Sequence, residues 1–151
     1  ETPDPFLARR HHDPTARAGL GRTLAAARLP SAMIDLSDGL LQDLGHLLAA
    51  SGVGARVERE ALPLSAPFRA ALAGEPGCID LALGGGEDYE LLLTVPPERE
   101  AALAEVAART GVPLARVGEI TAPAGGLTVL DGEGRDCTPR RGGFNHFAAV
   151  G

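Results

Sequence analysis

The segment at residues 35–40, Asp-Leu-Ser-Asp-Gly-Leu, has the residue types of a magnesium site. The carboxylates of Asp35 and Asp38 are three residues apart and converge if the chain turns into a helix here. Carboxylates are hard oxygen ligands that suit Mg²⁺, an ion that also binds phosphate oxygens. The Ser37 hydroxyl or a nearby backbone N–H could then contact a phosphate at the helix N-terminus. The alternative is that Ser37 or Asp38 only caps the helix and that Asp35 is an ordinary loop residue.

A second candidate segment is Gly-Gly-Gly-Glu-Asp-Tyr-Glu-Leu at residues 84–91. Its three glycines allow the backbone to approach a ligand closely or to adopt positive φ. Three carboxylates follow within four residues, and burying them without partners would be costly. The segment is therefore either a ligand-facing loop or a solvated turn before a strand.

A third segment, Gly-Gly-Phe-Asn-His-Phe at residues 142–147, holds two of the four Phe residues of the chain. Terminal segments are usually poorly ordered unless they dock, and the two aromatic side chains favour docking. A lone residue such as His146 is more often a hydrogen-bonded structural group than a catalytic base. Asp43, eight residues after Asp35, could face solvent or the site, and we assign it no function.

Alternating helices and strands are predicted to position these segments. Helices are expected over residues 15–28, 38–51, 66–73, 79–83 and 97–110, and strands over residues 32–34, 55–58, 89–95, 114–120 and 127–130. Asp13-Pro14 resembles a helix start, which leaves residues 1–13 as a linker. Asp131-Gly132 indicates a hairpin between residues 127–130 and 135–138. The pattern favours an α+β fold with mixed α/β layers, in which helices pack against a mixed sheet.

Composition limits the classes of function. The chain has 151 residues, a typical length for one domain, and its core must be mainly aliphatic because aromatic residues make up only 3%. The net charge of −6 argues against nucleic-acid binding. The sequence contains no apolar run of about 18 residues, so we predict no membrane span. The absence of Lys excludes a P-loop lysine and a Schiff-base lysine. Cys78 and Cys137 lie outside any CxxC pair, which argues against zinc and favours two free thiols.

Residues 35–40, 85–92 and 143–147 together resemble the signatures of the C-terminal half of the thiamine-monophosphate kinase family, in order and in spacing. Residues 117–120, Val-Gly-Glu-Ile, resemble the strand before the final hairpin of that family, and the resemblance covers residues 7–148. The most specific part is Gly-Gly-Glu-Asp-Tyr-Glu-Leu. The family belongs to the superfamily of aminoimidazole ribonucleotide synthetase, with selenophosphate synthetase and a hydrogenase-maturation protein as relatives.

This resemblance implies an aminoimidazole ribonucleotide synthetase C-terminal-like fold. Residues 14–151 would be the C-terminal domain of a two-domain kinase whose N-terminal domain is absent from the chain, which starts at Glu1 in a Pro-rich stretch. The whole enzyme would be a cytoplasmic homodimer that phosphorylates thiamine monophosphate to thiamine diphosphate with ATP and Mg²⁺, by direct in-line transfer. The fragment alone would be inactive.

The resemblance also implies roles for single residues. Asp35 and Asp38 match Mg²⁺ ligands, Ser37 matches a contact of the nucleotide, and Glu87 and Phe144 match contacts of thiamine phosphate. No residue matches a catalytic acid or base. Two departures stand out: Asn145 replaces a more usual Asp, and residues 15–17, Thr-Ala-Arg, replace a more usual Pro-Arg pattern.

The sequence leaves two other functions possible. A sister ATP-dependent enzyme, similar to selenophosphate synthetase or to the hydrogenase-maturation factor, would keep the fold and use another acceptor. A non-enzymatic ligand-binding module would keep the fold without catalysis.

Overall fold

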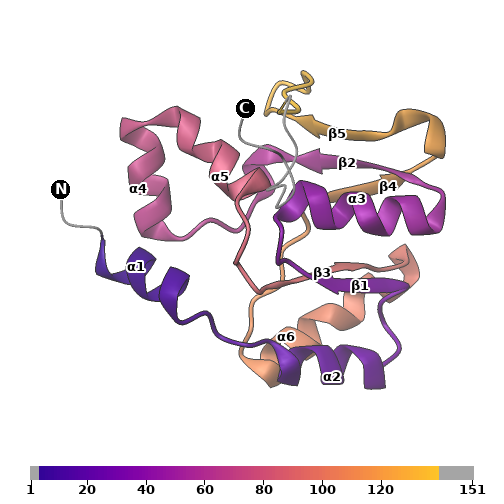
Figure 1. Cartoon of the computed structure of the whole chain (residues 1–151). Helices are drawn as coiled ribbons and strands as arrows, with labels where there is room; N and C mark the ends of the chain where they lie inside the picture. The colour runs from indigo at the N-terminus through magenta and orange to yellow at the C-terminus, as the bar shows by residue number, and fades with distance from the viewer. Residues whose placement is uncertain (1–3, 140–151) are drawn as a thin grey trace.

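The computed structural model describes residues 4–139 and consists of helices packed around two small sheets (Figure 1). The expected α+β class is confirmed. The helices are α1 (Pro5–His12), α2 (Ala18–Ala26), α3 (Leu40–Ser51), α4 (Ala66–Gly74), α5 (Ile79–Gly84) and α6 (Leu103–Thr110). The strands are β1 (Ala32–Asp35), β2 (Gly54–Glu58), β3 (Leu91–Thr94), β4 (Gly118–Thr121) and β5 (Leu127–Leu130).

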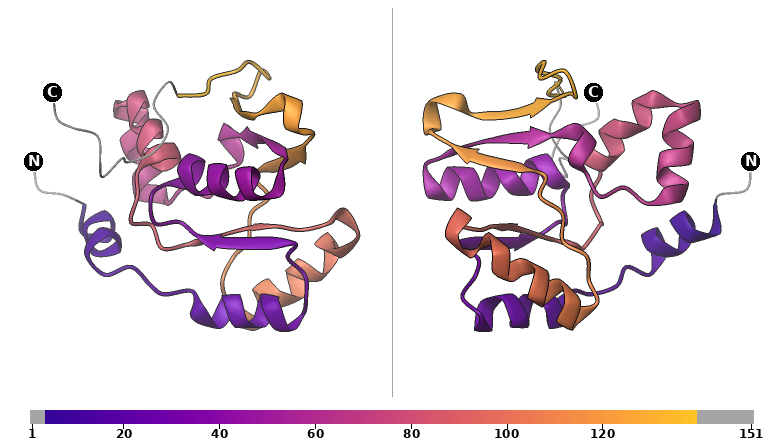
Figure 2. Two further views of the ribbon diagram at one scale, coloured as in Figure 1. Left: turned by 45° about the vertical axis from the view of Figure 1, so that its right-hand side comes forward. Right: turned by 180° about the vertical axis from the view of Figure 1, so that it is seen from behind.

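The strands form two sheets instead of the single mixed sheet that the sequence suggested. β1 and β3 are antiparallel, with Ala32 opposite Thr94 and Asp35 opposite Leu91. The second sheet has the order β4-β2-β5, in which β2 is antiparallel to β4 and parallel to β5. Figures 1 and 2 show α3 between the two sheets, while α2 and α6 lie on the opposite side of the β1–β3 pair.

The core is aliphatic, as predicted from composition, and it has two parts. The larger part joins the apolar face of α3 to β2 and β5, and its buried residues are Leu40, Leu41, Leu44, Leu48, Ala55, Val57, Leu62, Leu83 and Val129. The smaller part joins α2 to α6 through Leu20, Leu24, Leu29 and Val106. The first part fixes α3, and therefore the loop that precedes α3, against the three-stranded sheet.

The glycine caps predicted for two helices are confirmed. Gly52 ends α3 with φ 64° and Gly111 ends α6 with φ 67°, the left-handed conformation that glycine adopts without a Cβ penalty. Cys78 and Cys137 are free thiols. Within residues 4–139 the structure has no helix that is long and apolar enough to cross a membrane.

The predicted start of the first helix is wrong. Residues 5–12, expected to be linker, form α1, and the Asp4 carboxylate caps this helix by accepting the N–H groups of Phe6 and Leu7. Asp13 lies at the C-terminal end of α1, and α2 begins only at Ala18. Asp4-Pro5 therefore has the capping role that we assigned to Asp13-Pro14.

Some predicted elements are shorter than expected. Regular pairing in β3 and β4 covers four residues each, and residues 97–102 form a 3₁₀ helix before α6. The hairpin after β5 has one bridge, between Leu130 and Asp136. The Asp131 carboxylate accepts the N–H groups of Glu133 and Arg135, so a side chain takes backbone donors that a longer ladder would use.

Candidate functional site

The first two candidate segments lie side by side beyond the ends of β1 and β3. The Leu36 N–H donates to the Glu90 carbonyl at 2.9 Å, and the Tyr89 N–H donates to the Leu36 carbonyl at 2.8 Å. The Glu87 N–H donates to the Ser37 carbonyl at 2.8 Å. These bonds continue the β1–β3 pairing in irregular form. Residues 35–39 and 84–90 therefore form one structural unit, which we call the paired loops.

The glycines of the paired loops allow two backbones to approach each other. A Cβ on Gly86 would lie 2.5 Å from the Ser37 carbonyl oxygen, and one on Gly39 would lie 2.9 Å from the Gly84 carbonyl oxygen. The positive φ angles in the second loop belong to Glu87 (69°) and Tyr89 (49°) instead of to glycine. Non-glycine residues in this conformation are strained and are concentrated at functional sites.

Asp43 organises the loop before α3, a role that our sequence reasoning missed. One carboxylate oxygen, Oδ2, accepts the backbone N–H groups of Ser37 and Asp38 at 3.0 Å each and that of Gly39 at 3.2 Å. Asp43 is only 2% exposed, and it is the one buried charged residue in the described part of the chain. Gly39 occupies the N-cap position, so the alternative that Ser37 or Asp38 caps α3 is wrong.

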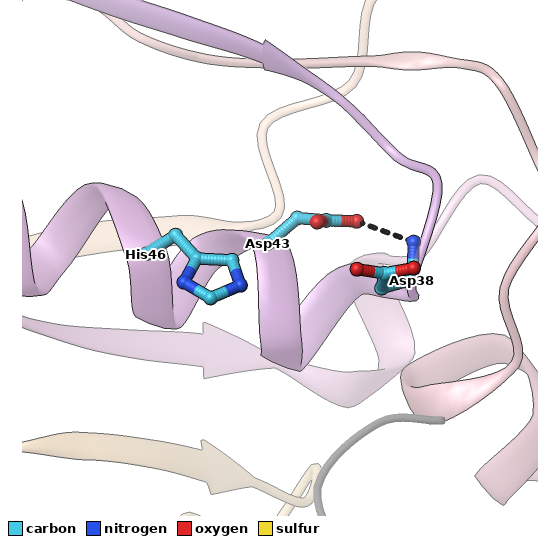
Figure 3. A group of neighbouring side chains, drawn as sticks. All are labelled: Asp38, Asp43 and His46. Carbon is cyan, nitrogen blue, oxygen red and sulfur yellow. Dashed lines mark hydrogen bonds between the residues drawn. The ribbon is translucent and has the colours of Figure 1, made fainter. Parts of the chain in front are cut away.

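Asp38 precedes the N-cap of α3, and its carboxylate lies beside side chains of the first two turns of this helix. Ligand atoms of Asp38, Asp43 and His46 all lie within 4.8 Å of one another (Figure 3). The Gln42 side-chain amide also donates to Asp38 Oδ2 at 3.2 Å. Asp35 ends β1 with an exposed side chain and does not belong to this group. The expected convergence of Asp35 and Asp38 on a cation stays a prediction.

Glu90 is held by two arginines from the N-terminal part of the chain. Arg17 donates to its carboxylate through Nε and Nη2, at 2.7 Å each, and Arg10 of α1 donates at 2.5 Å. Burial of the Glu90 carboxyl opposes ionisation, but the hydrogen bonds and charges of the two arginines outweigh it and lower its pKa. The departure at residues 15–17 therefore still places an Arg at the paired loops.

The other two acids of this segment face solvent. Glu87 Oε2 lies 3.8 Å from His11 Nδ1, and both side chains are more than half exposed. Desolvation of the carboxyl and, to a smaller extent, the Glu90 charge together raise the pKa of Asp88 to about 6, against the opposing charge of Arg10. Asp88 is nevertheless exposed by surface area, so solvent screening keeps the effect on stability small. Phe144 lies outside the described residues.

The Glu90→Gln variant should be less stable than the parent chain above about pH 5, and the difference should shrink in acid. Because the folded state lowers the pKa of Glu90 below its ordinary 4.5, its contribution is present above that value and lost as pH falls through the folded pKa. We expect a difference of about 1 kcal/mol or less at pH 7, since Glu90 is partly exposed. Urea unfolding at pH 7 and pH 3.5 measures it.

The control for this variant is Glu119→Gln, which breaks the more exposed Arg56–Glu119 pair across β2 and β4. That variant should change stability less at pH 7. An equal loss in both variants, or a Glu90→Gln loss that grows in acid, would contradict the assignment.

Comparison with known proteins gives a consistent result. The model of the AIR synthase related protein, C-terminal domain, matches residues 8–130. A curated relative, the thiamine-monophosphate kinase of Salmonella typhimurium (strain LT2), is 43% identical over 98% of this chain and 44% of its own length. The chain thus spans less than half the length of the curated relatives that it matches.

Solved structures agree with this result. The crystal structure of thiamine-monophosphate kinase from Stenotrophomonas maltophilia K279a has a TM-score of 0.74 and 40% identity, over 82% of this chain and 38% of the other. AaThiL complexed with AMPPCP and TMP has a TM-score of 0.73 and 31% identity, over 97% of this chain and 44% of the other. The resemblance to the thiamine-monophosphate kinases is confirmed.

Proposed function

Because the chain belongs to the AIR synthase related family, through the C-terminal domain of that family, we propose that it is the C-terminal domain of a thiamine-monophosphate kinase. The whole enzyme transfers the γ-phosphoryl group of ATP to thiamine monophosphate and releases thiamine diphosphate and ADP. The names of the relatives support this activity, and AMPPCP and TMP in a solved neighbour correspond to a nucleotide and the acceptor.

One observation carries the proposal: backbone hydrogen bonds join the two segments on which the resemblance depends. Leu36 and Ser37 of the first segment bond directly to residues 87–90 of the second. Ser37, which we propose contacts ATP, is hydrogen-bonded through its backbone to Glu87, which we propose contacts the thiamine phosphate. The two acids proposed for Mg²⁺ lie in the same segment as Ser37. A donor and an acceptor bound to the two loops would therefore lie next to each other.

The acids of the first segment fit Mg²⁺ by their chemistry. Asp35 is exposed and Asp38 is half-buried, and carboxylates are the hard oxygen ligands that Mg²⁺ prefers. Bound Mg²⁺ would offset the repulsion between the two anionic substrates. Asp35 and Asp38 hold the cation, and the Ser37 side chain contacts ATP. The Ser37, Asp38 and Gly39 N–H groups are already bonded to Asp43, so we do not assign phosphate to them.

The acceptor is bound by the second segment and the C-terminal tail. Glu87 and Phe144 contact thiamine monophosphate, with the aromatic ring packing against the thiamine. The attacking phosphate oxygen is already ionised at neutral pH, so no side chain must act as a base. Catalysis then consists of positioning and charge neutralisation in a direct in-line transfer.

The rest of the enzyme completes the site in this proposal. An N-terminal domain of the same polypeptide supplies further acids and part of the nucleotide site, and two such polypeptides form a cytoplasmic homodimer. The chain spans 44% of the Salmonella relative, which leaves room for such a domain.

An acceptor screen tests the proposal. The full-length parent protein, given ATP and Mg²⁺, should release ADP when thiamine monophosphate is added, and not when selenide replaces it. The 151-residue chain alone should release no ADP above background. Consumption of ATP that depends on selenide would transfer the assignment to a sister enzyme, and ADP release by the fragment alone would show that the N-terminal domain is dispensable.

A further inference from the structure

We propose that Asp43 is a positioning residue that holds the 37–39 loop in the conformation that the Mg²⁺ and ATP sites require. The inference deepens the proposed function and rests on it for the roles of Ser37 and Asp38. The family resemblance assigns no role to Asp43. The role proposed here follows from the contacts of Asp43, its burial and its place on α3.

Three successive backbone amides converge on one oxygen of Asp43. The N–H groups of Ser37, Asp38 and Gly39 all point to Asp43 Oδ2, at 3.0, 3.0 and 3.2 Å. Successive N–H groups of this kind form a concave anion-binding site. Here a carboxylate of the same chain occupies that site, so one side chain fixes the direction of three peptide groups.

The Asp43 side chain is also buried. Asp43 is 2% exposed, on the helix that also buries Leu40, Leu44 and Leu48. A buried carboxylate is tolerated only where hydrogen bonds stabilise its charge, and bonds to a charged acceptor are the strongest of their kind. The leucines of α3 pack against β2 and hold the helix in place. The Asp43 carboxylate therefore holds the three loop amides at a fixed position relative to this helix.

The 37–39 loop carries residues that the proposed function assigns to ATP and Mg²⁺. Two of the three bonded amides belong to Ser37 and Asp38 themselves, so their Cα positions follow Asp43 directly. Mutation of a group that hydrogen-bonds to a metal ligand and orients it commonly lowers metal affinity or activity about 10- to 100-fold. Asp43 is within 4.8 Å of Asp38 and His46, but one of its oxygens already accepts three N–H groups. We therefore assign it to positioning and not to metal binding.

The first test uses the 151-residue chain without Mg²⁺ and does not depend on catalysis. Amide hydrogen exchange, followed by NMR, should show faster exchange at Ser37, Asp38 and Gly39 in Asp43→Asn and faster still in Asp43→Ala. Asn keeps an acceptor oxygen but loses the charge, so its effect should be intermediate. Val106→Ala is the control, because it removes packing from the smaller core around α2 and α6, which contains no residue of α3. Unchanged exchange at the three amides in Asp43→Ala would overturn the proposal.

The second test uses the full-length parent saturated with AMPPCP, and titrates Mg²⁺ by calorimetry. Mg²⁺ affinity should fall about 10- to 100-fold in Asp43→Asn and stay near that of the parent in Val106→Ala. Equal losses in both variants would reduce Asp43 to a stabilising residue and overturn the positioning role. Neither test needs an acceptor, so failure of the kinase assignment would show separately, as absence of thiamine diphosphate in the parent.

Discussion

Replacing Asp38 with Asn in the full-length parent is expected to lower the rate of thiamine diphosphate formation about a hundredfold or more. The substitution keeps the size of the side chain and removes the charge that would hold Mg²⁺. A correctly held cation contributes several kcal/mol to the transition state, and each 1.36 kcal/mol is about tenfold in rate. The measurement is kcat at saturating ATP, with Mg²⁺ varied over a wide range.

Folding should survive this change, because Gly39 and not Asp38 stands at the N-cap of α3. Glu105→Gln is the matched control: it also removes one negative charge, from an exposed position on α6. It should leave kcat unchanged. A wild-type rate in Asp38→Asn at every Mg²⁺ concentration would make Asp38 a simple loop residue.

The Gly86→Ala variant should separate the paired loops and lose both stability and activity. Its Cβ would lie 2.5 Å from the Ser37 carbonyl oxygen, which already accepts the Glu87 N–H. Backbone cannot rotate away as a side chain can, so we expect a cost of about 1–3 kcal/mol in the free energy of unfolding. Chemical denaturation of the chain measures this cost, and turnover of the parent measures the effect on the site.

Gly45→Ala is the control for this substitution. Gly45 lies inside α3, and a Cβ there would meet no heavy atom within 4 Å. The same change should therefore stabilise the chain by roughly 0.5–1 kcal/mol, the usual gain of Ala over Gly in a helix. Equal stability of Gly86→Ala and the parent chain would show that the two loops are not in close contact in solution.

The sequence predicted α3 well and missed α1, because only α3 is encoded by a pattern of neighbouring residues. The apolar stripe of α3 and its glycine cap at Gly52 are encoded within about 13 neighbouring residues, at the helical repeat. α1 has no such stripe, because its last four residues are Arg-Arg-His-His and none of its residues is buried. It is positioned by Arg10, which reaches Glu90 from 80 residues away. Pairings of this kind cannot be read from a window of sequence.

The candidate site also combines features that neighbouring residues encode with features that depend on distant contacts. The residue types of segments 35–40 and 84–91 indicated chemistry, but their hydrogen-bonded pairing depends on the fold. Asp43 was missed because an acid in a helix is usually exposed. One signal could have found it: Asp43 is three residues after Leu40 and four before Leu47, which puts a carboxylate on the apolar stripe. An acid in that position needs buried donors, and the nearest are the amides before the helix.

Direct in-line transfer to thiamine monophosphate can be tested in a single-turnover reaction of the full-length parent with γ-labelled ATP, Mg²⁺ and thiamine monophosphate. We expect the label to move from ATP to thiamine diphosphate in step with ADP, with no labelled protein at any time in rapidly quenched samples. ADP formation without labelled thiamine diphosphate, or a labelled protein that forms and decays before product, would contradict it.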